Sequence, residues 1–281
     1  KILFQKVAKE DVASWGDFPL PNLGTYPLSH KIHSGHALDF VRYASSVQGN
    51  YELASESAWT MANSIKDKQI MIMQGQKRVA APWQVLKTFG KWDEILKLKP
   101  RHTGTPYLDG IWSYVKGSAH LAKGNKKQAK QELNKLKQIL NLPNVDKYRA
   151  GATPVSRVLK AAAYGLEGEI FLASGKYTEA IQAFSLAVAL EDQNNYTEPP
   201  DWPHPMRLYL GSSLLAANKF KEAEKVYRRD LDWNKNNGWS LFGLQQSLQL
   251  QGKTDEAEMI YKEFLLAWQH ADIELSDSFI K

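Results

Sequence analysis

The sequence contains no cysteine among its 281 residues. Disulfide bonds, thiolate metal sites and catalysis by a cysteine nucleophile are therefore excluded. The chain also lacks a run of about 18 apolar residues, the length from which a membrane-spanning helix is read. Lys1 to Phe4 lack the long apolar stretch of a secretory signal peptide. We expect no membrane span, and the composition is compatible with cytoplasm or periplasm.

Motifs of catalysis are absent as well. The chain has no glycine-rich phosphate loop, no Gly-x-Ser-x-Gly and no His-Glu-x-x-His. Glu167 and Glu169 flank Gly168, but residues two apart on a helix point to different sides. They therefore do not form a carboxylate pair for acid–base catalysis. We predict a non-catalytic protein that uses no cofactor.

The net charge of +6 is unevenly distributed. Between residues 121 and 138, six lysines stand against one acid, Glu132, whereas acids prevail from residue 251 to 281. A basic stripe can attract nucleic acid or an acidic partner. This stripe has no arginine, whose fork of donors nucleic-acid readers favour. We interpret it as a solvated helix face and predict no nucleic-acid binding.

The region from Pro205 to Ala271 repeats itself at an offset of 34 residues, so that Leu210 corresponds to Leu244. Further identities at this offset are Ser213/Ser247, Leu214/Leu248, Lys219/Lys253, Glu222/Glu256, Ala223/Ala257, Glu224/Glu258 and Tyr227/Tyr261. Each copy has the pattern of an amphipathic helix, a short turn and a second amphipathic helix. Agreement at one fixed offset predicts two copies of one structural unit.

The segment around Gly175 carries the same pattern most fully. Gly168 precedes the turn Gly175-Lys176-Tyr177, and Ala180, Phe184 and Ala187 follow it. In these residues the chain resembles the tetratricopeptide repeat family. The resemblance implies an all-α fold, an α-solenoid of stacked helix-turn-helix repeats that form a right-handed superhelix. It also implies a protein or peptide as the partner.

A longer set of residues resembles a bacterial subfamily of tetratricopeptide proteins of uncharacterised function. It includes Glu198-Pro199-Pro200-Asp201-Trp202, Phe89-Gly90-Lys91-Trp92-Asp93-Glu94 and Asn237-Gly238-Trp239. Members are typically longer at the N-terminus, so the resemblance implies that this chain is the C-terminal part of a larger solenoid. We expect residues 1–34 to be an extended lead-in, the remnant of an upstream repeat region, because Pro and Gly interrupt any regular element there.

Residues 35–281 are expected to form the solenoid itself, from six helix pairs. Their approximate limits are 35–66, 76–100, 110–140, 161–192, 204–237 and 238–271. The pairs align on a turn residue that favours the left-handed conformation: Gly49, Gly90, Gly124, Gly175, Asn218 and Gly252. Insertions at about 66–74, 141–157 and 193–203 are expected to emerge along one edge.

Small residues are expected where the two helices of a pair cross. Gly117, Gly168 and Gly211 stand seven residues before their turn residues in the first helix, and Ala180 stands five residues after its turn residue in the second. Phe184, Tyr227 and Tyr261 are expected to fill the gap to the next repeat. One pair cannot bury its apolar faces alone, so the pairs must stack.

The first helices of the pairs are expected to line a concave groove, the usual binding surface of a solenoid. Aromatic and polar side chains facing this groove suit the capture of a peptide. The candidate partner-binding residues are His36, Asp39, Tyr43, Gln84, Tyr114, Glu169, Trp202, Arg207, Trp239, Phe242 and Gln246. Two alternatives stay open: Trp202 either plugs the superhelix or lies over the groove mouth, and Trp239 and Phe242 either line the groove or belong to the core.

An alternative function rests on three histidines. His30, His33 and His36 are spaced three apart, which places neighbours on one helical face, and imidazoles are ordinary metal ligands. The triplet contains no carboxylate, although Asp39 follows His36 by three residues. The helix is expected to begin only at Gly35 or His36. The leading hypothesis is therefore a non-catalytic scaffold for a protein or peptide, and the alternative is a metal- or small-molecule-binding module around His36.

Overall fold

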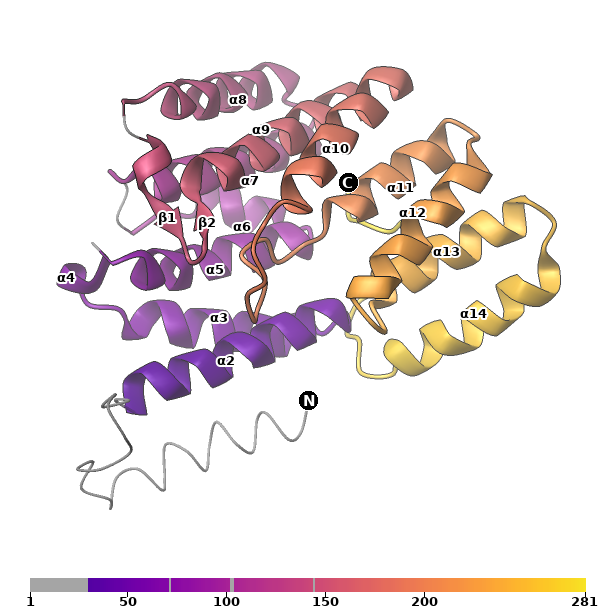
Figure 1. Cartoon of the computed structure of the whole chain (residues 1–281), viewed down its shortest axis with the longest axis horizontal. Helices are drawn as coiled ribbons and strands as arrows, with labels where there is room; N and C mark the ends of the chain where they lie inside the picture. Colours follow the sequence, from indigo (N-terminus) through magenta and orange to yellow (C-terminus); the bar gives the residue numbers. More distant parts are fainter. Residues whose placement is uncertain (1–29, 71, 102–103, 144) are drawn as a thin grey trace.

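The computed structural model describes residues 30–281, except 71, 102–103 and 144. Residues 1–29, most of the expected lead-in, lie outside the described residues. The described part contains 13 α-helices, numbered α2 to α14 (Figure 1). The expected all-α solenoid is confirmed, because twelve of these helices form six consecutive antiparallel pairs.

The helix pairs follow one another along the chain. The first three are α2 (His30–Val47) with α3 (Tyr51–Ser64), α5 (Met73–Thr88) with α6 (Trp92–Lys97), and α7 (Pro106–Ala122) with α8 (Lys126–Leu140). The last three are α9 (Val155–Leu172) with α10 (Tyr177–Glu191), α11 (Met206–Ala216) with α12 (Phe220–Trp233), and α13 (Gly238–Leu250) with α14 (Thr254–Ala267). Helix α2 begins at His30, so the expectation that it starts at Gly35 or His36 is wrong.

The six turns within the pairs share one backbone conformation. Each predicted turn residue has a positive φ, from 58° at Asn218 to 77° at Gly124. A residue in this left-handed conformation ends a helix and lets the following N–H groups return to its last carbonyls. At Gly124, for example, the N–H of Asn125 donates to the carbonyl of His120 at 2.8 Å. The sequence alignment on these residues therefore identified the turns correctly.

Close crossing of the helices requires the small residues. A Cβ atom placed on Gly168 would lie 2.7 Å from the ring of Phe184 in the paired helix, and one on Gly211 would lie 2.3 Å from Tyr227. The same Tyr227 would meet a Cβ on Gly243, so its ring fills the gap to the next repeat as expected. Tyr261 does not do so. It is 46% exposed, because α14 is the last helix of the described stack.

Connections between the pairs carry the insertions. The first contains the short helix α4 (Asp67–Ile70). The second contains a 3₁₀ turn (Val145–Lys147) and a hairpin of two-residue strands, β1 (Arg149–Ala150) and β2 (Thr153–Pro154). The third insertion lies beside this hairpin, since the Asn195 amide donates to the carbonyl of Ala152 at 3.2 Å.

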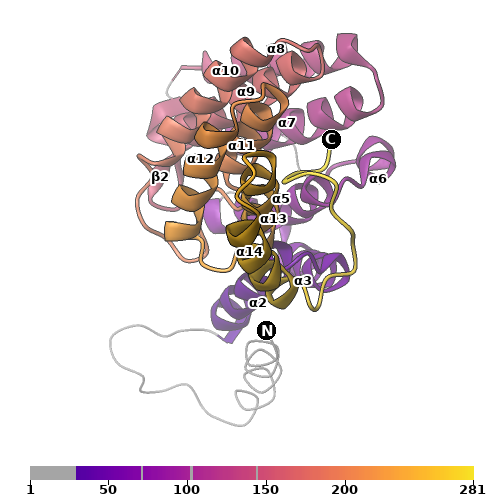
Figure 2. The ribbon, with the colours of Figure 1, turned by 90° about the vertical axis from the view of Figure 1, so that its right-hand side faces the viewer.

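The stack curls until its first pair meets its last (Figure 2). The indole N–H of Trp239 in α13 donates to the carbonyl of Ser46 in α2 at 2.9 Å. The amide of Asn50 donates to the carbonyl of His270 at 2.7 Å. The carboxylate of Asp272 accepts the backbone N–H groups of Tyr51 and Glu52, at 2.7 and 2.8 Å. These bonds close the solenoid, so its inner face is a short enclosed trough rather than an open groove.

Candidate functional site: the inner face of the closed solenoid

Four successive first helices meet at one buried cation. The ammonium of Lys87 in α5 lies 2.8 Å from the hydroxyl of Tyr209 in α11 and 3.0 Å from a carboxylate oxygen of Glu169 in α9. It also stands 4.6 Å from the ring centre of Tyr114 in α7 and 4.7 Å from that of Tyr209. Such ring faces attract a cation. Lys87 therefore ties together the central four repeats from the inside.

The protonation of this cluster follows from its partners. Burial alone would lower the pKa of Lys87, but the charge of Glu169 and the contact with Tyr209 outweigh it and raise the pKa above its usual value. Lys87 is thus a charged ammonium at neutral pH. A charged lysine is not the free amine that covalent catalysis needs, so the geometry favours a role in binding and stability.

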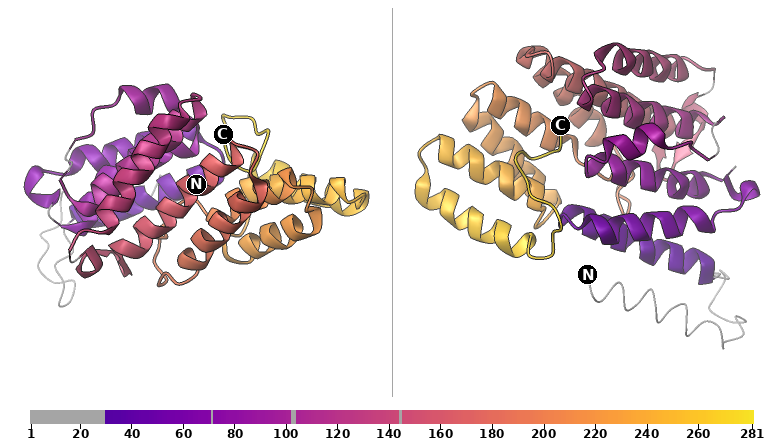
Figure 3. Two further views of the ribbon diagram at one scale, coloured as in Figure 1. Left: turned by 90° about the horizontal axis from the view of Figure 1, so that it is seen from above. Right: turned by 180° about the vertical axis from the view of Figure 1, so that it is seen from behind.

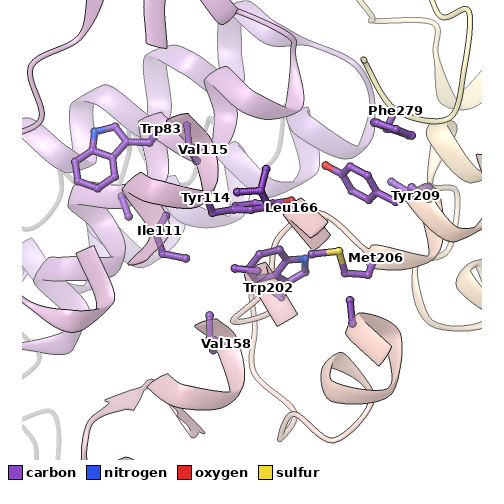
Figure 4. Close-up of a cluster of buried hydrophobic side chains, with 14 of the residues drawn as sticks. Trp83, Ile111, Tyr114, Val115, Val158, Leu166, Trp202, Met206, Tyr209 and Phe279 are labelled. Atoms are coloured by element: carbon purple, nitrogen blue, oxygen red, sulfur yellow. The ribbon is translucent and has the colours of Figure 1, made fainter. Parts of the chain in front are cut away.

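A loop from the third insertion closes one side of this centre. Trp202 packs its ring 5.4 Å from that of Tyr114 (Figure 4). It is anchored by the neighbouring Asp201, whose carboxylate pairs with Lys77 at 2.5 Å. His204 lies edge-on to Tyr209 and Trp239. Burial, and then the charge of Lys87, lower the pKa of His204 to about 3, so its imidazole is neutral.

The C-terminal segment, residues 272–281, crosses the other side of the trough. We call it the tail. Figure 3 (right panel) shows it running from the end of α14 along the inner side toward the C-terminus. Phe279 is buried with its ring centre 4.3 Å from that of Tyr209, which places it directly over the Lys87 cluster. The segment has no helix or strand of its own.

Two cavities flank the tail. The first, of about 420 Å³, lies between the tail and the C-terminal ends of α7 and α9. Its lining includes Leu121, Leu172, Ala173 and the carboxylate-bearing Glu169. The second, of about 450 Å³, lies between the tail and helices α11 and α13, and Gln246 and Gln249 contribute to its wall. The tail thus divides one trough into two halves, each lined by both apolar and polar side chains.

Most residues predicted to line the groove do not form an open surface. Tyr114, Glu169, Trp202 and Trp239 are buried at the centre of the closed solenoid. For Trp202 the plug alternative therefore describes the structure, and for Trp239 the core alternative does. Closure of the solenoid is the physical reason, because it turns the middle of the concave face into interior. A partner-binding role for these residues stays a prediction.

The other predicted residues are dispersed. Asp39 pairs with Arg42 at 2.6 Å, and Arg207 makes two bonds of 2.7 Å to the carboxylate of Asp192. His36 is exposed and stacks edge-on against Phe40. Gln84 and Gln246 are half-buried, and only Gln246 reaches a cavity of the trough. Phe242 is half-buried, with its ring 5.5 Å from that of Phe264 in α14.

A second polar cluster occupies the seam between the first and last repeats. The hydroxyl of Tyr43 donates to Asn234 at 2.9 Å, and Asn234, Asn237 and Ser240 all donate to the buried carboxylate of Asp230. Burial raises the pKa of Asp230 and outweighs these bonds. It also raises the pKa of Tyr43 to about 12, with Asp230 contributing.

Nothing in the described residues supports the histidine metal site. No group of three or more His, Cys, Asp or Glu side chains capable of holding a metal occurs among them. The side chains of His30 and His33 lie outside the described part of the chain.

Sequence reasoning missed the tail altogether. The available signal was the set of apolar residues Ile273, Leu275, Phe279 and Ile280, spread through a segment that also carries three acids. Apolar residues beyond the last helix need a surface to cover them, and the trough supplies that surface.

Comparison with known proteins agrees with the architecture. The tetratricopeptide repeat family model matches residues 149–198, the segment that contains α9, α10 and the turn at Gly175. No curated protein matches the chain. In the described residues, no helix is both long and apolar enough to cross a membrane. Assignment to a bacterial subfamily stays a prediction. The matched segment lies in the middle of six consecutive helix pairs, and residues 149–198 therefore carry a tetratricopeptide repeat.

Proposed function

We propose that this protein is an interaction scaffold whose inner trough binds an extended segment of a partner protein. One observation carries the proposal. The tail, a segment without helix or strand, already lies across the trough and makes specific side-chain contacts with α11 and α12. A surface that accommodates one extended chain has the shape and chemistry to accommodate another.

The two cavities fit this role. Side chains of an extended peptide point alternately to opposite sides of its backbone. The trough offers one cavity on each side of the tail, the first lined by Leu121, Leu172 and Glu169, the second by Leu215, Gln246 and Gln249. A bound segment would therefore place successive side chains in the two cavities. Tetratricopeptide repeats are typically non-catalytic, which agrees with a binding role.

Arginine substitutions that fill each cavity test the proposal. Ala173→Arg places a bulky cation in the first cavity and Gln249→Arg places one in the second, and both positions are exposed enough to leave the fold intact. Ala189→Arg on the exposed face of α10 is the matched control. Peptides selected from a random display library against the wild-type chain should lose binding to the two cavity variants and keep it to the control. Equal binding to all three variants would contradict the proposal.

A further inference from the structure

We propose that the partner segment carries an acidic residue, a hydroxyl residue and phenylalanine in succession, and that Asp277-Ser278-Phe279 of the tail is an internal competitor for the same position. The inference rests on the proposed function and specifies both the ligand and its regulation. The contacts of these three tail residues define the recognition chemistry.

The hydroxyl of Ser278 occupies the most specific position of the three tail residues. It is fully buried, lies 2.7 Å from the hydroxyl of Tyr227 and donates to the carbonyl of Leu208 at 2.9 Å. A buried hydroxyl pocket of this kind selects a small hydroxyl residue, since an apolar replacement leaves the pocket's polar groups without partners. A larger side chain has no room there, because Tyr227 also packs against Gly211 and Gly243.

Phe279 defines the aromatic position of the partner segment. Phe279 is 3% exposed and stacks on Tyr209 with an interplanar angle of 36°. Tyr209 is itself fixed by its hydrogen bond from Lys87, so the platform for the aromatic ring exists independently of the tail. Rigid aromatic platforms at the centre of an interface are typical of residues that dominate binding energy.

The acidic position receives one hydrogen bond from the helices of the trough. The hydroxyl of Ser212 in α11 donates to the carboxylate of Asp277 at 2.9 Å, and Lys281 also pairs with that carboxylate. In contrast, Glu274 and Ser276 of the tail are exposed. Ile273, Leu275 and Ile280 also pack against the core, but the side-chain hydrogen bonds from α11 and α12 fall on Asp277 and Ser278.

The way the tail is anchored allows a partner segment to replace residues 277–279. Asp272 holds its beginning at the N-terminal end of α3, and the contacts of residues 277–279 hold its far end. The chain between these anchors belongs to no helix or sheet. Release of residues 277–279 would therefore leave the six helix pairs and the closing contact at Asp272 in place. A competing segment would then occupy the freed positions and extend into the adjoining cavities.

A peptide with the sequence of residues 272–281, labelled at its N-terminus, is the probe. Its dissociation constant is measured by fluorescence anisotropy with the wild-type chain of residues 1–281 and with the double variant Ser278→Ala/Phe279→Ala of the same chain, whose own tail is held less tightly. The apparent affinity of an occupied site is reduced by the fraction of molecules in which the site is free. We expect the double variant to bind at least about tenfold more tightly than the wild type.

Three controls make the result specific. Glu274→Ala changes an exposed tail residue and should bind the probe as the wild type does. A probe with alanine at positions 278 and 279 should bind the double variant at least about tenfold more weakly than the natural sequence. Tyr227→Phe added to the double variant removes the hydroxyl that meets Ser278 and should also weaken binding.

Equal affinities of the wild type and a double variant with unchanged helix content would overturn the inference, and so would absence of binding to that variant. If the double variant fails to fold, Ser278→Ala alone replaces it, because that change keeps the aromatic contact. A smaller gain in affinity is then expected, and no gain overturns the inference. A chain that binds display-selected peptides in the trough but not this probe would retain the proposed function and lose only the tail's role.

Discussion

The indole nitrogen of Trp239 donates a hydrogen bond of 2.9 Å to the carbonyl of Ser46, although 193 residues separate the two in sequence. This bond joins the last helix pair to the first. The ring of Trp239 also packs edge-on against His204 and Trp268. A single side chain thus connects the closing seam, the buried loop and the last repeat.

Trp239→Phe should destabilise the protein by about 1–3 kcal/mol, because it removes the buried hydrogen bond to the carbonyl of Ser46 and creates a small cavity. Chemical denaturation followed by circular dichroism measures the change. The matched control is Trp233→Phe in α12, where the side chain is 68% exposed and the cost should stay within about 0.5 kcal/mol. Similar losses at both positions would contradict the closing role of Trp239.

The ion pair between Lys87 and Glu169 should show strong energetic coupling. Lys87→Met alone leaves a buried carboxylate without its cation and should cost about 3–5 kcal/mol of unfolding free energy. Adding Glu169→Leu removes the uncompensated charge, so the double variant should be less destabilised than the sum of the two single variants. Additive losses in this double-mutant cycle would mean that the two side chains do not interact.

Glu191 should make stability fall as the pH rises. Its carboxylate lies between the end of α10 and the start of α11, where burial raises the pKa to about 8 despite a 2.8 Å bond from the N–H of Met206. Asp230 and Asp192 add to the rise, and Arg207 opposes it. The folded state therefore holds a proton that the unfolded state releases near its usual pKa of about 4.5.

The stabilising effect of that proton is complete below about pH 4.5 and is lost as the pH increases through about 8. Glu191→Gln, whose amide oxygen can still accept from Met206, should reduce the slope between these values. The slope equals at most about 1.4 kcal/mol per pH unit for one group. A slope equal to that of the wild type in urea titrations at several pH values would exclude this role. Part of the slope should persist, because the pKa of Asp230 is also raised.

Glu224, at the contact between the last two repeats, should make stability rise with pH, the opposite of the effect of Glu191. Burial would raise its pKa, but hydrogen bonds from Lys253, Gln251 and Arg228 prevail and lower the pKa to about 2. Its contribution is therefore present above about pH 4.5 and is lost as the pH falls through about 2. Glu224→Gln should cost about 1–3 kcal/mol at pH 7 and almost nothing near pH 2.

The exposed Glu222 on the same helix provides the control for that measurement. Glu222→Gln should change the unfolding free energy by less than about 0.5 kcal/mol at either pH. A cost of Glu224→Gln that stays constant with pH would show that shape, rather than charge, accounts for the effect.

Local features of the fold could be predicted from the sequence because they have local causes. Gly124 and Asn218 are turn residues that favour a positive φ, and Gly211 is small because Tyr227 packs directly on it. Each of these requirements is visible within one repeat of the sequence. The number of helix pairs and their turns therefore followed from periodicity and residue type.

Closure of the solenoid has no such local cause. It depends on the rotation between successive pairs summed over the whole stack, and no single repeat encodes that sum. For this reason the sequence placed Tyr114 on a concave groove and left Trp239 undecided between groove and core, whereas both are interior. The tail was missed for a related reason, since its binding surface is assembled from α11 and α12 only after they have folded.

The contact between the first and last pairs also bears on how the protein loses its structure. In an open array each terminal repeat has one neighbour and can melt before the middle does. Here the contacts of Trp239 with Ser46, and of Asp272 with Tyr51, give both ends a second neighbour. Unravelling from either end must break this seam first, so calorimetric and spectroscopic unfolding curves should coincide in one cooperative transition.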